Sequence, residues 1–341
     1  MRKFLPLKKF GNSLMLLVMA GTTLVSCGGK QQSGDVAEGD SIRVPDFNAD
    51  SAFQSIVKQC SFGPRVMNSE AHDRCGDYIV ETFEAYGLSV TQQEATISSY
   101  DGKPLKMRNI IARCDTANPA RILLCAHWDS RPWADNDPDE ANRKKPVMAA
   151  NDGASGVAVL LEIARIIKET KPAVGIDFVC FDAEDGGVPS WDDVEDEQAE
   201  MNSWCLGSQY FSANLISPSY SPRYGVLLDM VGARGARFYK EGFSMQYASA
   251  VVDKMWSAAS RAGYSSYFVQ EDGGYVTDDH GPLNQIARIP TIDIIPCFKN
   301  MSGSSFGPTW HTLSDTPENI DKGTLKAVGQ SVLQLLFEEK D

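Results

Sequence analysis

Histidines and acidic residues recur in short segments that could bind a metal ion and transfer protons. These residues are His127 and Asp129, Asp152, Glu184 and Asp185, Asp229, and His311. Imidazole nitrogens and carboxylate oxygens together form the ligand sets that hard or borderline cations prefer. A desolvated carboxyl group beside such a set can act as a general acid or base. The residue types therefore predict a metal-dependent enzyme, if the fold brings the segments together.

Each segment alone is weak evidence for such a site. A single His or Asp at a strand end is more often a cap or a hydrogen-bonded structural group, and Asp-Gly is usually a turn. The combination is stronger evidence, because two of only four histidines and several acids follow apolar segments in the same way. The carboxyl ends of strands in an α/β sheet are where such folds place their chemistry, so we expect the side chains to converge there.

Short apolar segments rich in β-branched residues predict strands buried on both faces, at 121–126, 175–181, 224–230 and 289–295. Two alternating segments predict a pair of edge strands, at 88–97 and 105–113. Helical patterns occupy residues 50–60, 69–86, 153–168, 205–215, 244–261 and 325–338. The alternation of strands and helices predicts an α/β three-layer sandwich, in which helices flank a mixed, mostly parallel central sheet.

The order of the motifs resembles that of the zinc-dependent aminopeptidase and glutaminyl cyclase superfamily. The matching motifs are, in order, His127-x-Asp129, Asn151-Asp152-Gly153-Ala154-Ser155-Gly156, Glu184-Asp185, Asp229 at a strand end, and His311. The resemblance extends from about Phe47 to the C-terminus. It implies a zinc aminopeptidase-like, phosphorylase/hydrolase-like fold and one catalytic domain over residues 46–341.

The aminopeptidase pattern implies two zinc ions that share one carboxylate. One ion would be bound by His127, Asp152 and Asp229, and the other by Asp152, Asp185 and His311. Glu184 would be the general base. Asp129 would orient His127 from outside the ligand set, and Asp315 would do the same for His311.

Other details resemble glutaminyl cyclases, particularly those of Bacteroidetes-like bacteria. They include Trp310 before His311, the run Thr277-Asp278-Asp279-His280, and Ala183-Glu184-Asp185 in place of the paired Glu of aminopeptidases. The cyclases generally use a single Zn²⁺, so this branch implies Asp152, Asp185 and His311 as its ligands. Because His127 and Asp229 are also present, the sequence leaves a second ion open.

The cyclase branch implies a glutaminyl-peptide cyclotransferase, which converts the N-terminal Gln of peptides or proteins into pyroglutamate and releases ammonia. Glu184 would be the general acid and base, Asp278 would hold the leaving amide nitrogen, and Asp229 would hydrogen-bond beside Glu184. The alternative functions are a dinuclear zinc aminopeptidase and a binding protein that keeps the fold without catalysis. The intact acids of the motifs argue against the last alternative.

Aromatic residues are expected to form the walls of the substrate pocket. Trp310 is adjacent to a predicted ligand, which favours a place in the wall over simple packing. A second Trp would close the pocket, either Trp191 or Trp204, and we select Trp191. His280 is expected close to Asp278, outside the ligand set.

The N-terminal segment predicts export. A basic head and an apolar stretch too short to span a membrane are followed by Leu-Val-Ser-Cys at 24–27, which resembles the lipobox of bacterial lipoproteins. We therefore expect a lipoprotein signal peptide over 1–26, a flexible tether over 27–45 and a lipid anchor on Cys27. Gly28 after this cysteine favours the outer membrane, with the catalytic domain in the periplasm.

The composition is that of a globular protein, with 43% hydrophobic and 23% charged residues among 341. Acidic residues outnumber basic ones by 45 to 32, a sign that argues against a nucleic-acid partner, and no obligate protein partner is indicated. Beyond Cys27 the cysteines are odd in number, so at least one is free and no pairing follows. We expect His72 on a helix surface and the acidic run 135–140 in a solvated loop.

Overall fold

The computed structural model describes residues 43–192, 194–299, 301 and 304–340. The predicted signal peptide, the predicted lipid attachment at Cys27 and the tether up to residue 42 lie outside these ranges. Within the described ranges, no helix combines the length and the apolar character needed to cross a membrane. The seven cysteines of these ranges are all free thiols.

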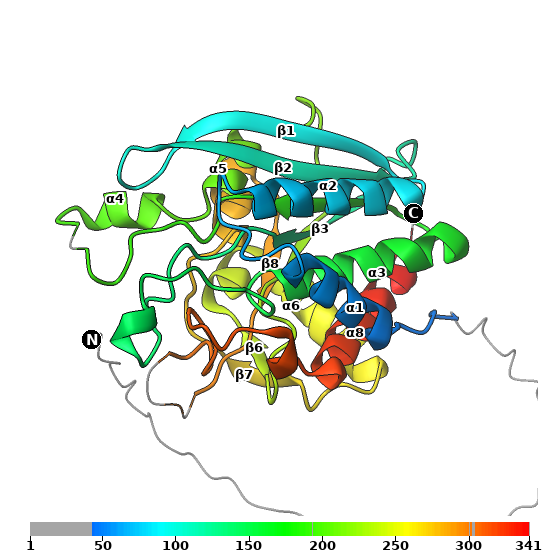
Figure 1. Cartoon of the computed structure of the whole chain (residues 1–341). Coiled ribbons are helices and arrows are strands. Elements are labelled where there is room, and N and C mark those ends of the chain that lie inside the picture. Colours follow the sequence, from blue (N-terminus) through cyan, green and yellow to red (C-terminus); the bar gives the residue numbers. More distant parts are fainter. Residues whose placement is uncertain (1–42, 193, 300, 302–303, 341) are drawn as a thin grey trace, which may run out of the picture. The chain divides into compact units, whose positions relative to one another are not determined.

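Six strands form the central sheet, in the order β1-β2-β4-β3-β5-β8 (Figure 1). Their bounds are β1 Ser89–Ser98, β2 Pro104–Cys114, β3 Arg121–His127, β4 Gly175–Phe181, β5 Gly225–Leu228 and β8 Thr291–Ile294. β1 and β2 form the predicted antiparallel edge pair, and β2 joins β4 antiparallel. The strands β4, β3, β5 and β8 are parallel to their neighbours. The predicted mixed, mostly parallel sheet is therefore confirmed.

Helices cover both faces of this sheet. One face packs in a single hydrophobic cluster against α1 Ala49–Cys60, α2 Glu70–Ala85, α3 Ala154–Thr170, α6 Gly242–Arg261 and α8 Lys322–Glu338. The other face packs against α5 Leu206–Ala213 and the π-helical turn Leu283–Ala287, which follows the short α7 His280–Pro282. Strand β3 shows the division, because Leu124 belongs to the first cluster and Leu123 to the second. The three-layer sandwich is confirmed.

Several short elements lack a signal in the sequence. A second, two-stranded sheet pairs β6 Phe238–Lys240 with β7 Phe268–Asp272. Short helical segments are α4 Glu197–Asn202, η1 Glu140–Asn142 and η3 Pro317–Asn319. Each is too short for hydrophobic periodicity to identify it. By contrast, α2 begins where its Ser69 cap predicts, because the Ser69 side chain accepts a hydrogen bond from the His72 amide.

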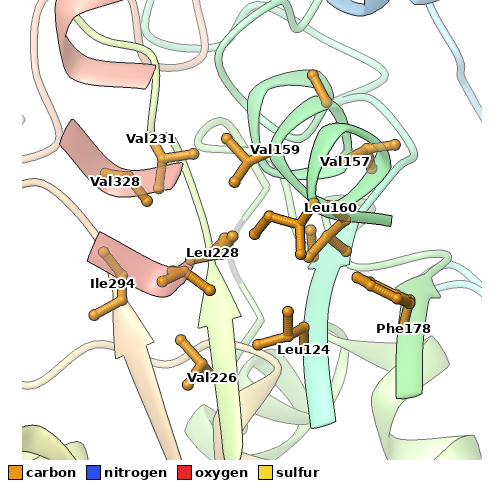
Figure 2. Packing of buried hydrophobic residues seen from close by; sticks show 14 of the residues in the cluster. Leu124, Val157, Val159, Leu160, Phe178, Val226, Leu228, Val231, Ile294 and Val328 are labelled. Atoms are coloured by element: carbon orange, nitrogen blue, oxygen red, sulfur yellow. The ribbon is translucent and has the colours of Figure 1, made fainter. Parts of the chain in front are cut away.

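Helix α3 packs unusually close to the sheet, which places its N-terminus at the strand ends. Leu124, Phe178 and Val226 meet Val157 and Leu160 of α3 in the first cluster, as Figure 2 shows. At Gly156 a Cβ atom would lie 2.2 Å from the carbonyl oxygen of Leu228 in β5. Only glycine allows this approach of helix and strand.

A Gly156→Ala substitution should therefore destabilise the fold. The added methyl group would collide with backbone, which cannot rotate away, so we expect the free energy of unfolding to fall by about 2 kcal/mol in chemical denaturation. The control is Gly281→Ala, because a Cβ at Gly281 meets no atom within 4 Å. That variant should remain within about 0.5 kcal/mol of the parent. Equal stability of the two variants would contradict the proposed close contact.

Candidate active site

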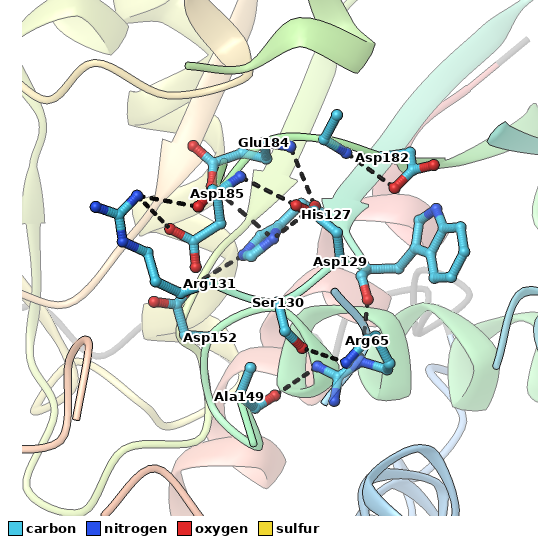
Figure 3. Close-up of polar contacts among 12 residues, drawn as sticks. Arg65, His127, Asp129, Ser130, Arg131, Ala149, Asp152, Asp182, Glu184 and Asp185 are labelled. Carbon is cyan, nitrogen blue, oxygen red and sulfur yellow. Dashed lines mark hydrogen bonds and ion pairs between the residues drawn. The ribbon is translucent and has the colours of Figure 1, made fainter. Parts of the chain in front are cut away.

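The predicted ligands and acids meet at the carboxyl edge of the sheet. His127 is the last residue of β3, Asp229 directly follows β5, and Glu184 and Asp185 lie in the loop after β4. Asp152 immediately precedes Gly153, the N-cap of α3. Figure 3 shows His127, Asp152, Glu184 and Asp185 pointing toward one another from these loops. The parallel strands thus bring the residues together, as the sequence predicts.

The turn before α3 fixes the position of Asp152. Asp315 accepts hydrogen bonds from the backbone amides of Asn151 at 2.8 Å and Asp152 at 3.0 Å. Gly153 has φ +65°, and a Cβ there would lie 2.5 Å from the His127 carbonyl oxygen. Burial and the nearby Asp152 carboxylate raise the pKa of Asp315 to about 7. The expectation that Asp315 orients His311 is therefore wrong, because Asp315 orients Asp152.

Asp135 orients His311 instead. Its carboxylate lies 3.3 Å from His311 Nδ1, which leaves Nε2 facing Asp185 at 3.0 Å and Asp152 at 3.7 Å. Arg131 donates two hydrogen bonds to the same carboxylate. Burial alone would raise the pKa of Asp135, but the contacts with His311 and Arg131 hold it well below its usual value. The prediction of a solvated loop is thus wrong for Asp135 and Asp137, which are both buried.

Two groups of side chains that share Asp152 could each hold a metal ion. Within each group the ligand atoms lie within 4.8 Å of one another, and the groups are Asp152–Asp185–His311 and His127–Asp152–Asp229. In the first group, Asp185 Oδ2 is buried without a hydrogen-bond partner among the described residues. A buried carboxylate oxygen without a hydrogen-bond donor requires a proton or a cation. The donor set of two carboxylates and one imidazole, whose other nitrogen binds Asp135, fits zinc.

Asp129 holds the loop that carries the two adjacent acids. It accepts hydrogen bonds from the backbone amides of Glu184 and Asp185, both at 3.1 Å. Its Oδ1 also lies 3.5 Å from His127 Nδ1. The His127 Nε2 atom lies 3.0 Å from Asp152 and 3.2 Å from Asp229. Asp129 therefore lies beside His127 Nδ1 without a hydrogen bond to it, and it fixes the turn that presents Glu184.

Glu184 has the environment of a proton-transferring acid. Burial raises its pKa well above the usual value, and the negative charges of Asp185 and Asp278 raise it further, while His127 opposes the shift. Its side chain contacts the thiol of Cys205 at 3.4 Å and lies 3.9 Å from His127 Nδ1. A carboxyl group with a raised pKa can both accept and return a proton near neutral pH.

A small pocket with a volume of ≈ 60 Å³ lies at this edge of the sheet. Glu184 lines it together with two further acids, Asp229 and Asp278. Burial and neighbouring carboxylates raise the pKa of Asp229 to about 6 and that of Asp278 to about 7, although contacts with His127 oppose the shift at Asp229. The lining residues are Asp152, Glu184, Asp185, Trp204, Asp229, Met230, Val276, Thr277, Asp278, Ile295, Phe306, Trp310 and His311. The pocket therefore contains the predicted catalytic acids and one complete ligand set.

Two tryptophans form walls of this pocket, but one differs from the prediction. Trp310 stacks on His311 with ring centroids 3.8 Å apart, and Trp204 lies parallel to the same imidazole at 6.2 Å. Trp191 does not line the pocket. It is 41% exposed and packs edge-on against Trp133. The selection of Trp191 is therefore corrected to Trp204, which Arg131 supports from behind through a cation–π contact.

Two buried arginines and one histidine that the sequence did not identify connect the site loops. Arg131 donates to the carbonyl oxygens of Asp185, Gly187 and Val188. Arg65 donates to those of Trp128, Met148 and Ala149, as Figure 3 shows in part. His72 is buried, bonds to Asp182 at 2.9 Å and stacks on Trp128.

The expectation of a surface His72 is thus wrong, since its ring lies on the inner side of α2. For the arginines the only signal was their position, because Arg65 follows a Gly-Pro turn and Arg131 lies four residues after His127. His280 lies near Asp278, as expected, but its Nε2 atom bonds to Glu241 at 3.1 Å.

The three-layer fold and the buried acids around two imidazoles define a zinc-dependent enzyme of the aminopeptidase-like type. Residues 109–336 match the model of peptidase family M28. The chain therefore belongs to this family.

Solved structures with high identity cover most of the chain. The glutaminyl cyclase of Bacteroides thetaiotaomicron, bound to N-acetylhistamine, is 49% identical, with 87% of this chain and 100% of that chain covered and a TM-score of 0.85. A structure described as a leucine aminopeptidase precursor from the same species is 48% identical, with 88% and 100% covered and a TM-score of 0.84. Similar proteins thus carry both descriptions.

Curated relatives are more distant. The glutaminyl-peptide cyclotransferase of Bos taurus is 22% identical over 68% of this chain and 65% of its own length. The chain spans between 33% and 65% of the length of the first curated relatives that it matches.

Replacing Asp135 by Asn should weaken zinc binding. The substitution removes the charge that orients His311 through Nδ1, so we expect the zinc dissociation constant to rise about tenfold. Competition with a chelator of known affinity would measure the change. The control is Asp139→Asn, which makes the same change in the same loop. Asp139 caps the short helix η1 and has no contact with His311 among those found for it. Unchanged zinc affinity in Asp135→Asn would show that this carboxylate does not support the ligand set.

Proposed function

We propose that the protein is a zinc-dependent glutaminyl-peptide cyclotransferase that acts on peptides or proteins with N-terminal Gln. The observation that carries the proposal is the pocket itself. A buried acid, Glu184, faces a cavity that is small enough for one side chain, is walled by Trp204 and Trp310, and contains the Asp152–Asp185–His311 set. The similarity to glutaminyl cyclases at about half of the positions supports the same assignment.

The reaction requires proton transfer and orientation, but no activated water. The α-amine of the N-terminal Gln attacks the carbon of its own side-chain amide, a new carbon–nitrogen bond closes the five-membered ring, and the bond to the amide nitrogen breaks. Because both groups belong to one residue, holding the side chain in a folded conformation supplies much of the rate. A narrow pocket with two indole walls suits this task, since it limits the conformations of the bound side chain.

Glu184 carries the proton between the two nitrogens. It takes one proton from the attacking amine and delivers it to the departing nitrogen, which leaves as ammonia. The raised pKa of Glu184 matches both steps. Asp278, in the same pocket, accepts a hydrogen bond from the leaving amide nitrogen. Asp229 lines the pocket with Glu184 and supports the polar network around this acid.

The metal set contributes electrophilic assistance. When bound by Asp152, Asp185 and His311, zinc supplies Lewis-acid polarisation of the side-chain amide carbonyl. The role of the protein is to hold these three side chains through Asp315, Asp129 and Asp135. We propose one such ion per chain.

Incubation of the purified zinc-loaded protein with a Gln-initiated peptide tests the function. We expect a product lighter by one ammonia, detected by mass spectrometry. Removal of the entire first residue would contradict the proposal and identify an aminopeptidase.

Glu184→Gln should abolish ammonia release while zinc remains bound. The amide keeps the size of the side chain but cannot exchange the proton, and general acid–base catalysis typically contributes a factor of about 10² to 10⁴. The measurement is the rate of ammonia release together with zinc content by elemental analysis. Glu197→Gln, in the exposed helix α4, is the matched control and should keep the parental rate. Near-normal turnover in Glu184→Gln would overturn the assigned mechanism.

A dinuclear aminopeptidase is the second candidate function, because the His127–Asp152–Asp229 set is also assembled. It is distinguished by zinc content and substrate. Two zinc ions per chain and hydrolysis of aminoacyl amides other than Gln would favour it.

We also propose that the mature protein is exported and held at the outer membrane by a lipid on Cys27, with its catalytic domain in the periplasm. The support is the lipobox-like run at 24–27 behind a basic, apolar leader, together with Gly28. The wild-type chain should incorporate labelled palmitate and sediment with outer membranes, whereas Cys27→Ser should do neither. Labelling of the Cys27→Ser chain would refute this site of attachment.

A further inference from the structure

The carboxyl group of Glu184 has one direct hydrogen-bond donor among the described side chains, the thiol of Cys205. The Sγ atom of Cys205 lies 3.4 Å from Glu184 Oε1, a normal length for a sulfur donor. The nearest imidazole nitrogen, His127 Nδ1, is 3.9 Å from the other oxygen, which is too long for a hydrogen bond. The orientation of the proposed proton carrier therefore depends on this thiol more than on any charged neighbour.

The backbone holds Cys205 in position for this contact. Its amide donates to the Glu184 carbonyl oxygen at 3.0 Å, and the next amide, of Leu206, donates to Ala183 at 3.0 Å. Cys205 adopts φ +57°, and Ala183 adopts φ +54°, a region that residues other than glycine rarely occupy. Such conformations persist where the surrounding structure enforces them, often at functional sites. The two strained segments are thus clamped together, with the thiol on one and the acid on the other.

The side chain of Cys205 is not used in the way usual for its position. Cys205 precedes helix α5 as its N-cap, where a polar side chain normally bonds to a free amide of the first turn. Here the left-handed backbone directs the side chain elsewhere, and it makes no capping bond. Because burial raises the pKa of this thiol well above its usual value, it stays protonated and can donate.

We propose that Cys205 is a positioning residue for catalysis, whose thiol donates to Glu184 and keeps that carboxyl group turned toward the pocket. The inference rests on the proposed function for its kinetic consequence, but the hydrogen bond itself can be measured separately. A purely structural role would require only that a small apolar side chain fill the space.

Infrared spectroscopy tests the hydrogen bond without reference to activity. The S–H stretching band of Cys205 is identified by its loss in Cys205→Ala. We expect it at lower frequency than the band of Cys75, a thiol buried in the hydrophobic cluster. In Glu184→Leu, which removes the acceptor in either protonation state, the Cys205 band should shift to higher frequency. A band that does not respond to Glu184→Leu would overturn the proposal.

Kinetics of the zinc-loaded protein with a Gln-initiated peptide test the consequence. Loss of the donor in Cys205→Ala should lower kcat about tenfold with KM changed less than about twofold, since binding of substrate does not involve the thiol. Cys205→Ser keeps a donor and should recover to within about threefold of the parent. Cys75→Ala removes an equally buried thiol and should leave kcat unchanged.

Normal kcat in Cys205→Ala, or an equal loss in Cys205→Ser, would overturn the positioning role. Absence of ammonia release by the wild-type protein would instead refute the proposed function, and the infrared bands would then decide whether the thiol holds Glu184.

Discussion

Burial of many carboxyl groups at one edge of the sheet is the constraint on which the site depends. Asp152, Glu184, Asp185, Asp229 and Asp278 are all largely removed from solvent and face one pocket. Like charges in such a place repel one another and lose hydration, so each needs a proton, a cation or several hydrogen-bond donors. The surrounding structure supplies these partners one acid at a time. Among the described residues, Glu184 receives one side-chain donor, the Cys205 thiol, and its pKa is raised well above the usual value by burial.

The compensating groups are also the groups that fix the geometry. Asp129 and Asp315, two acids outside the ligand sets, accept hydrogen bonds from the backbone amides of the turns that carry Glu184, Asp185 and Asp152. Arg131 and Arg65 tie the loops by binding their carbonyl oxygens. Strained residues concentrate in the same loops, including Ala149, Ala183, Cys205, Met230 and His311, all with positive φ. A rigid parallel sheet beneath the loops can hold these conformations, whereas an isolated loop would relax.

The contrast between a regular sheet and irregular loops explains what the sequence could predict. The strands and long helices follow from hydrophobic periodicity, and the convergence of His127, Asp152, Glu184 and Asp229 follows from the parallel arrangement of strand ends. The partner of His311 does not, because Asp135 is far from it in the chain and only the path of the loop brings the two side chains together. The same holds for Trp191 and Trp204, which lie in one irregular segment. His72 was expected on the surface because the sequence does not show its bond to Asp182, which is far away in the chain.

The two chemistries considered for this family differ chiefly in what occupies the second group of ligands. His127 Nε2 lies at hydrogen-bond distance from both Asp152 and Asp229. A proton on this nitrogen satisfies the two carboxylates without a metal ion, and it lets Asp152 serve the His311 set alone. A metal ion in the same place would require loss of that proton, and Asp152 would then bridge two ions. Asp129 lies 3.5 Å from Nδ1, and its charge helps to raise the pKa of the imidazole, so a metal ion at the second group would have to displace this proton. With a single ion at the His311 set there would be no second metal to activate a water, and the tethered amine of an N-terminal Gln would need none.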